Sequence, residues 1–144
     1  MKKLIDTTDF EFYSPVSSEM NISFGGNAMA GFIAQADDYL FQKIDLKREL
    51  IKHPESTFCV RVKGNSMDGD FQEGDLLIID RSLEFTDNKI ALCFLDNGFT
   101  LKRIKLKDGK CFLVPSNEDF PLIEVKEGED VIIWGVVAYS IKKH

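Results

Sequence analysis

Short apolar runs separated by turn signals follow one another after Pro54, at a spacing typical of an all-β barrel or sandwich. Residues 57–63 alternate strictly, with Phe58, Val60 and Val62 on one face of a predicted strand. Asp96-Asn97-Gly98 and Asp108-Gly109 have the composition of hairpin turns. Further strands are predicted at residues 76–79, 90–95, 99–106, 111–114, 123–125 and 131–141. The pattern therefore predicts a mainly β domain.

The residues before Pro54 follow a different pattern. Residues 37–51 are the helical candidates: Asp37 or Asp38 is a suitable N-cap for a first turn, and Asp45 for a second turn over 46–51. The first thirty residues contain scattered aromatic side chains but keep no period of 3.6 or 2. We therefore expect residues 1–30 to form a flexible N-terminal arm without elements of its own, and residues 31–144 to form a single β-rich domain.

Composition narrows the class of protein. Of the 144 residues, 44% are hydrophobic and only four are proline, which excludes a disordered or collagen-like chain. Eighteen Lys and Arg residues against 24 Asp and Glu give a net charge of −6, so direct specific DNA binding is not expected. The chain contains no apolar run of 18 residues and no apolar signal-peptide core, which predicts a cytoplasmic protein without a membrane span.

The cysteine and histidine content limits which disulfides, metal sites and catalytic groups are possible. Cys59, Cys93 and Cys111 are odd in number and form no CxxC pair, so we expect reduced thiols rather than a disulfide framework or a zinc site. His53 and His144 are the only histidines, which removes most histidine-based catalytic and metal sites. No metal and no cofactor is predicted.

Two features suggest a catalytic site. In the loop 63–70, Ser66 follows Gly64-Asn65, and a sharp turn there would present a hydroxyl beside backbone N–H groups. Lys102 falls on a strand face that also carries Ile104, and a desolvated neutral amine can act as the general base of a serine nucleophile. Each feature has an ordinary alternative: Gly-Asn-Ser is common turn chemistry, and a strand lysine can extend its ammonium to solvent.

Several segments together resemble the UmuD/LexA family of self-cleaving serine peptidases, the S24 type. The resemblance rests on segments in the same order and spacing: Gly64-Asn65-Ser66-Met67, Glu73-Gly74-Asp75-Leu76-Leu77-Ile78-Ile79-Asp80, Phe99-Thr100-Leu101-Lys102-Arg103, Ala30-Gly31, Asp38-Tyr39, Ile44-Asp45-Leu46, His53-Pro54 and Gly135-Val136-Val137. The chain is more similar to UmuD than to LexA, because residues 1–30 are too few for the helix-turn-helix domain of a repressor.

The resemblance implies a site and a fold. Ser66 would be the nucleophile, Lys102 the general base, and Ala30-Gly31 the bond that is cut in the chain's own arm. The implied fold is a twisted, partly barrel-like antiparallel sheet with a short helix. Two departures are visible: the scissile pair is Ala-Gly, as in the repressors, and the loop after Met67 is one residue short.

The resemblance also implies partners. It predicts a homodimer, a RecA filament as the trigger of cleavage, and a trimmed form that serves a UmuC-like Y-family polymerase in error-prone lesion bypass during the SOS response to DNA damage. Two other hypotheses stay open. One is a non-catalytic β-rich interaction module, and the other is a LexA-type transcriptional regulator without its DNA-binding domain.

Overall fold

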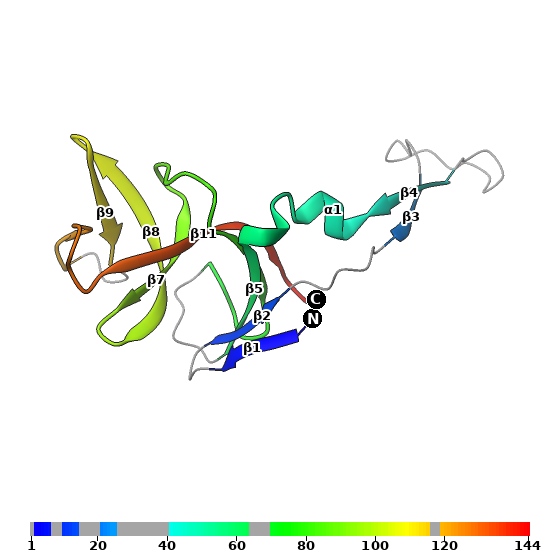
Figure 1. The fold of residues 1–144 in the computed structure, drawn as a ribbon, viewed down its shortest axis with the longest axis horizontal. Coiled ribbons are helices and arrows are strands. Elements are labelled where there is room, and N and C mark those ends of the chain that lie inside the picture. The colour runs from blue at the N-terminus through cyan, green and yellow to red at the C-terminus, as the bar shows by residue number, and fades with distance from the viewer. Residues whose placement is uncertain (1, 7–9, 15–20, 26–40, 64–69, 116–118) are drawn as a thin grey trace. The chain divides into compact units, whose positions relative to one another are not determined.

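The computed structural model describes residues 2–6, 10–14, 21–25, 41–63, 70–115 and 119–144. These residues form eleven strands, one short α-helix and one 3₁₀ turn (Figure 1). In chain order the elements are β1 (Lys2–Asp6), β2 (Phe10–Ser14), β3 (Asn21–Gly25), β4 (Phe41–Asp45), α1 (Leu46–Leu50), η2 (Pro54–Ser56), β5 (Thr57–Val62), β6 (Leu76–Asp80), β7 (Ile90–Leu95), β8 (Gly98–Lys107), β9 (Lys110–Val114), β10 (Ile123–Glu124) and β11 (Ile132–Ile141).

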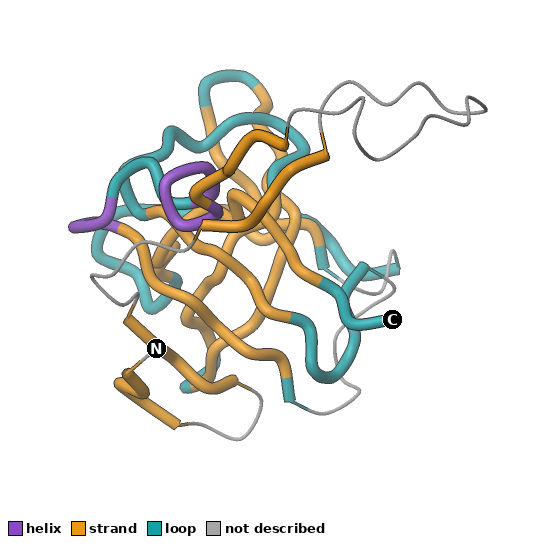
Figure 2. Tube along the Cα trace, turned by 90° about the vertical axis from the view of Figure 1, so that its right-hand side faces the viewer, coloured by secondary structure: helices purple, strands orange, loops and turns teal. Residues whose placement is uncertain are grey.

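Nine of these strands form one sheet in the order β1-β2-β5-β6-β11-β7-β8-β9-β10. Every neighbouring pair is antiparallel. The predicted mainly β, antiparallel fold is confirmed, and Figure 2 shows the strands curving around one another rather than lying flat. The order has two ends, so β1 and β10 are the edges of the sheet among the described residues.

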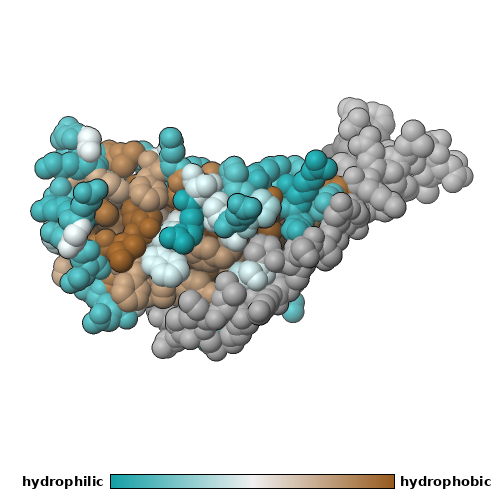
Figure 3. Space-filling model, viewed as in Figure 1, coloured by the Kyte–Doolittle hydropathy of each residue, from teal (hydrophilic) through white to brown (hydrophobic). Residues whose placement is uncertain are grey.

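The two faces of the sheet carry separate hydrophobic cores. Alternation along β7 places Leu92 in the first core and Ala91 and Cys93 in the second, all fully buried. Along β8, Leu101 belongs to the first core and Ile104 to the second. Apolar side chains also reach the surface where β8, β9 and the start of β11 lie (Figure 3), and the exposed ones in the described part of the chain include Leu106 and Ile132.

The predicted hairpin turns set the register of the central strands. Asp96 and Asn97 both have positive φ, at 51° and 61°, as a two-residue turn of type I′ requires. Asp108 and Gly109 repeat this conformation at the next turn, with φ of 51° and 74°. Together these turns fix β8 between β7 and β9 and thereby place Lys102.

Strand β11 joins the two halves of the sheet, pairing with β6 on one side and β7 on the other. Its ladders shift register between Val137 and Tyr139 and between Ile133 and Gly135, as at β-bulges. Gly135 leaves no room for a side chain, because a Cβ there would lie 2.7 Å from Cγ2 of Ile79. The close approach of the two strands explains why glycine occupies this position.

The helix prediction for residues 37–51 is correct only at its end. Asp45 caps α1 as expected, and its Oδ1 accepts a hydrogen bond of 3.2 Å from the Arg48 amide. Residues 41–45, however, form β4, which pairs antiparallel with β3. The pairing partner lies twenty residues earlier in the chain, so no local signal could outweigh the helical reading of this segment. Residues 37–40 lie outside the described residues.

The expectation that residues 1–30 form no element is wrong. Strands β1 and β2 belong to the main sheet, and β3 pairs with β4. The structure divides into two compact units, one of Met1–Val16 with His53–His144 and the other of Ser17–Lys52. The boundary expected between Ala30 and Gly31 falls within the second unit, and both residues lie outside the described part of the chain. No helix among the described residues has the length and apolarity to cross a membrane.

Candidate active site

Of the predicted site residues, the structure describes Lys102 alone. Ser66 lies in the segment 64–69, and Ala30 and Gly31 lie in the segment 26–40, both outside the described residues. The geometry of the candidate site therefore rests on Lys102 and on the residues that flank Ser66 in the chain.

Lys102 lies in the middle of β8, directly opposite Ala91 of β7. It is half-buried, and three neighbours on its own face are fully buried: Ala91 across the ladder, Ile104 two residues along, and Cys93 diagonally; Thr100, its other neighbour along the strand, is half-buried. The predicted alternation that puts Lys102 and Ile104 on one face is present. Lys102 thus extends from an apolar surface of the sheet rather than from a polar one.

Cys93 is an ionisable group on the same face, diagonal to Lys102 across the ladder. Its thiol donates a weak hydrogen bond of 3.6 Å to the carbonyl oxygen of Ala91. Burial raises the pKa of Cys93 to about 12, although the positive charge of Lys102 acts in the opposite direction. The thiol beside Lys102 is therefore neutral at physiological pH. All three cysteines are free, and Cys59 is buried like Cys93 whereas Cys111 is half-buried.

The strand ends that flank Ser66 are tied together by backbone hydrogen bonds. The Val62 amide donates to the Asp75 carbonyl at 2.9 Å, and the Gly74 amide donates to the Val62 carbonyl at 2.8 Å. Gly74 has a φ of 93°, a conformation that favours glycine. These bonds join the two ends of the chain segment that contains Ser66.

Asp75 holds the described residues just before β6 in place. Its buried carboxylate accepts a hydrogen bond of 2.9 Å from the Gln72 amide and one of 3.0 Å from Lys142 Nζ. Burial acts to raise the pKa of Asp75, but the Gln72 hydrogen bond and the Lys142 ammonium outweigh it and leave the pKa below its ordinary value. The carboxylate is charged at neutral pH and anchors both groups.

Arg103 connects the end of the segment 64–69 to β8. One guanidinium nitrogen donates to Asp70 Oδ2 at 2.8 Å, and the other donates to the Asn88 carbonyl at 2.8 Å. Arg103 and Lys102 are adjacent in the strand, so their side chains leave it on opposite faces. The contact therefore ties the residue that follows the Ser66 segment to the residue next to Lys102, on the opposite face of β8.

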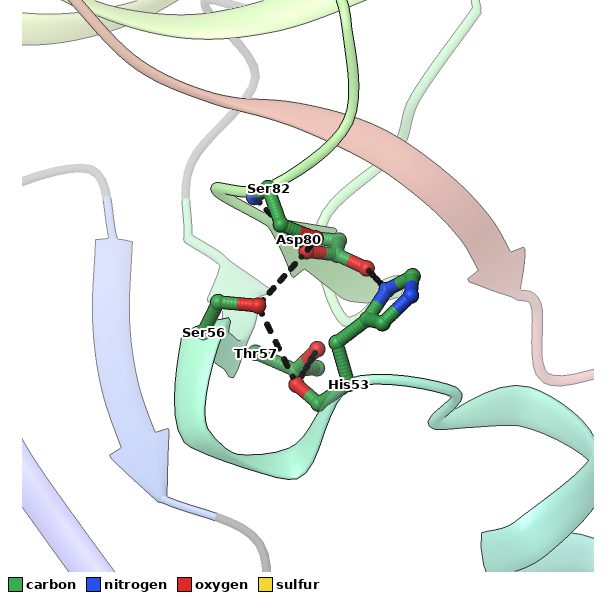
Figure 4. Close-up of polar contacts among 5 residues, drawn as sticks. All are labelled: His53, Ser56, Thr57, Asp80 and Ser82. Carbon is green, nitrogen blue, oxygen red and sulfur yellow. Dashed lines mark hydrogen bonds and ion pairs between the residues drawn. The ribbon is translucent and has the colours of Figure 1, made fainter.

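A second cluster of polar side chains surrounds the buried Asp80 at the end of β6 (Figure 4). Its Oδ2 lies 2.6 Å from His53 Nδ1, and its Oδ1 accepts from Ser56 Oγ at 2.9 Å and Ser82 Oγ at 2.6 Å. The Ser82 amide adds a further bond of 2.8 Å to Oδ1. Burial acts to raise the pKa of Asp80, but the hydrogen bonds from Ser82, His53 and Ser56 bring it down to about 2.

This cluster contains Ser, His and Asp side chains but lacks the geometry of a catalytic triad. In a triad the serine hydroxyl bonds to the histidine nitrogen that the aspartate leaves free. Here both hydroxyls bond to Asp80, and Figure 4 shows the second ring nitrogen of His53 pointing away from them. The His53 carbonyl also accepts from Thr57 Oγ1 at 2.7 Å. The cluster instead fixes the point where the chain enters β5.

Sequence reasoning missed this cluster. His53-Pro54 and Asp80 both belong to the segments that carry the family resemblance, but nothing in those segments predicts a contact between them. The available signal was weak: an aspartate that ends a buried strand and lies two residues before a serine, together with one of the two histidines in the chain. Nothing local connects His53 to a residue 27 positions away.

The low pKa of Asp80 gives an acid-stability prediction. The folded-state pKa of about 2 lies below the ordinary value of 3.8, so the stabilisation is complete above about pH 4 and disappears as pH falls through 2. Between pH 4 and pH 2 the wild type should lose about 2 kcal/mol that the Asp80→Asn variant does not lose. Urea unfolding of both proteins at several pH values in this range measures the difference. Parallel pH dependences would show that Asp80 is not responsible.

A comparison with known protein families identifies one that matches most of the chain. Residues 22–138 match the model of the family described as peptidase S24-like. The chain belongs to this family. The match includes Ala30, Gly31, Ser66 and Lys102 in one continuous span, and the resemblance inferred from the sequence motifs is confirmed.

Three similar proteins place the chain within the family. Protein MucA of Salmonella typhimurium is 40% identical over 117 residues, which cover 80% of each chain. Protein ImpA of Escherichia coli is 35% identical over 83% of this chain and 82% of its own. The LexA repressor of Paracidovorax citrulli is 29% identical over 94% of this chain but only 60% of its own length. The chain is thus a UmuD-like S24 protein.

Proposed function

We propose that this protein is a self-cleaving serine peptidase that cuts its own Ala30-Gly31 bond, with Ser66 as nucleophile and Lys102 as general base. The observation that carries the proposal is the position of Lys102 within the family match: on its face of the sheet it lies beside the fully buried Ala91 and Ile104. The Arg103–Asp70 contact supports the proposal, because it ties the chain that follows the Ser66 segment to the residue next to Lys102 in β8.

The reaction is peptide hydrolysis in two stages. Lys102 Nζ takes the proton of Ser66 Oγ, and the oxygen attacks the carbonyl carbon of Ala30 while backbone N–H groups at the Ser66 turn hold the oxyanion. The C–N bond then breaks, and the proton passes from Lys102 to the new amino group of Gly31. Water hydrolyses the ester at Ser66 by the same route. Tethering favours the first stage, because a well-oriented intramolecular reaction has an effective molarity of about 10⁵–10⁸ M.

The apolar surroundings of Lys102 suit this role. A lysine accepts a proton only as the neutral amine, and apolar neighbours solvate an ammonium ion poorly. Ala91 and Ile104 supply such neighbours.

The larger role follows from the UmuD-like relatives. We infer a cytoplasmic homodimer whose cleavage is promoted by a RecA filament after DNA damage, and whose trimmed form is the accessory subunit of a UmuC-like Y-family polymerase. The similarity to MucA and ImpA supports this role. Exposed apolar side chains on β11, among them Tyr139 and Ile141, suit a protein interface.

Mass spectrometry of the purified protein tests the reaction. Incubation between pH 7 and pH 10, with and without RecA filament, should produce a fragment of residues 1–30 in the mass spectrum, and faster at higher pH because the base must be neutral. Gly31→Glu should block the cut, since bulk beside the bond cannot enter a narrow site. A fragment that ends elsewhere would contradict the assigned bond. An intact mass under every condition would favour the non-catalytic interaction module.

Arg103 gives a separate prediction about positioning. Arg103→Ala removes the contact to Asp70, an exposed pair that contributes about 1 kcal/mol or less to stability. Cleavage should nevertheless slow by at least about tenfold, because small displacements of a nucleophile cost rate steeply. The matched control is Lys126→Ala, which removes a surface pair with Glu124 on β10. Equal cleavage rates in the two variants would exclude a positioning role for Arg103.

A further inference from the structure

Strand β2 is an interior strand of the main sheet, although it lies before the proposed cut. It pairs with β1 on one side and with β5 on the other. The register with β5 covers four residue pairs: Phe10 with Val62, Glu11 with Arg61, Phe12 with Val60, and Tyr13 with Cys59. The backbone of β2 therefore completes the hydrogen bonding of the strand that leads into the Ser66 segment.

Two side chains of β2 belong to the first hydrophobic core. Phe10 is fully buried, and Phe12 is 2% exposed. The Phe12 ring lies 4.9 Å from that of Phe99, 5.9 Å from Phe58 and 6.4 Å from Trp134, measured between centroids. Aromatic pairs at these separations contribute beyond the area that they bury.

The opposite face of β2 contributes charge complementarity. Glu11 lies directly opposite Arg61 in the ladder, and its Oε1 is 3.8 Å from Lys63 Nζ. The Tyr13 hydroxyl also donates to the Glu11 carboxylate. Residues 10–13 thus have alternating apolar and acidic contacts that fit β5 in one register only.

The proposed cut leaves all of these contacts intact. Residues 1–16 belong to the same compact unit as residues 53–144, whereas the Ala30-Gly31 bond falls within the range of the other unit, residues 17–52. Hydrolysis there breaks one covalent bond within the range of residues 17–52 and removes no contact of Phe10 or Phe12 with the sheet.

We propose that the fragment of residues 1–30 stays bound after cleavage, with β2 held on β5 as a non-covalent strand. The edge of β5 and the aromatic cluster of Phe58, Phe99 and Trp134 form the binding site, and its ligand is the extended segment of residues 10–14. Cleavage and release are then two separate steps. The order of events rests on the proposed self-cleavage, but the binding site does not.

The release step has a structural consequence. While β2 is in place, the hydrogen-bonding groups of β5 and the aromatic cluster are covered. Loss of the fragment turns β5 into an edge strand beside an apolar surface, which is an acceptor for another extended segment. The cut alone therefore does not expose this site.

The test separates binding from self-cleavage. In a full-length Ser66→Ala protein, a recognition sequence for an added site-specific protease replaces residues within 26–31, so that the chain is cut without its own chemistry. Native mass spectrometry and size exclusion should show both fragments in one 1:1 complex. Separate elution of the N-terminal fragment from a folded remainder would overturn the proposal. Absence of self-cleavage in the wild type would instead count against the proposed function alone.

A second measurement uses the fragment as a free ligand. A labelled peptide of residues 1–16 should exchange into the cut protein, and unlabelled peptide should compete with it. The Phe12→Ala peptide should bind at least about a hundredfold more weakly, since truncation of a buried phenylalanine costs more than two decades in an equilibrium constant. As a matched control, Phe120→Ala in the protein changes a side chain that is 63% exposed and should leave peptide binding unchanged. Equal affinity of the two peptides would exclude β2 as the ligand.

Discussion

Lys102→Met should abolish self-cleavage and leave the protein close to wild-type stability. Methionine keeps the length of the side chain on the face shared with Ala91 and Ile104, but it has no amine to accept the Ser66 proton. A volume-conserving exchange of this kind changes the free energy of unfolding by less than about 1.5 kcal/mol. Mass spectrometry at alkaline pH measures the cleavage, and urea unfolding at pH 7 measures the stability.

Two controls make this result interpretable. Ser66→Ala should be equally inactive, because it removes the nucleophile. Lys105→Met changes a neighbouring lysine of β8 that is exposed, and it should cleave at the wild-type rate. If Lys102→Met lost more than about 1.5 kcal/mol, Lys102 would be a structural cation, and the base assignment would have to be withdrawn.

The strands after Pro54 were predictable because their signals are local. Alternation identified β5, and the Asp-Asn-Gly and Asp-Gly turns identified the hairpins around β8 to within about two residues. Period 2 then placed Lys102 on the face of Ile104, which the register with Ala91 agrees with. A side chain's face within a strand is decided by chain geometry alone, so the sequence is sufficient for it.

The strands before Pro54 were not predictable in the same way. Residues 10–14 contain Phe10, Phe12 and Glu11 in alternation, but five residues are too few to distinguish a strand from scattered aromatics. What makes β2 a strand is the edge of β5, nearly fifty residues further along the chain. The same reason applies to β4, whose partner β3 was not recognised.

In the candidate site, too, the local features were predictable from the sequence and the long-range contacts were not. The family motif supplied Ser66 and the scissile bond, and the position of Lys102 followed from alternation. The contacts that hold the chain around these residues were not predictable. Arg103 donates to Asp70, which lies 33 positions earlier, and Lys142 donates to Asp75, which lies 67 positions earlier. Such pairs form only once the sheet has brought β6, β8 and the end of β11 together, and no pattern in the sequence specifies them.

Phe12→Ala should destabilise the intact protein by about 3–5 kcal/mol, the range for removing a fully buried phenylalanine from a core. The expected size follows from its position: the ring is 2% exposed and contacts the rings of Phe58, Phe99 and Trp134. If residues 1–30 were a flexible arm that contributes nothing to the core, Phe12→Ala would instead change the free energy of unfolding by no more than about 0.5 kcal/mol. The two descriptions of residues 1–30 therefore differ by several kcal/mol in one measurement.

Urea unfolding measures this change when Phe12→Ala is introduced into the Ser66→Ala protein, because self-cleavage cannot then alter the covalent chain. The control is Phe120→Ala, which removes the same atoms from a 63% exposed position and should change stability by about 0.5 kcal/mol or less. Phe12→Leu should recover part of the loss, because it restores apolar volume without the aromatic contacts. A Phe12→Ala effect no larger than that of Phe120→Ala would mean that β2 does not pack on the sheet in solution, and fragment retention after cleavage would lose its physical basis.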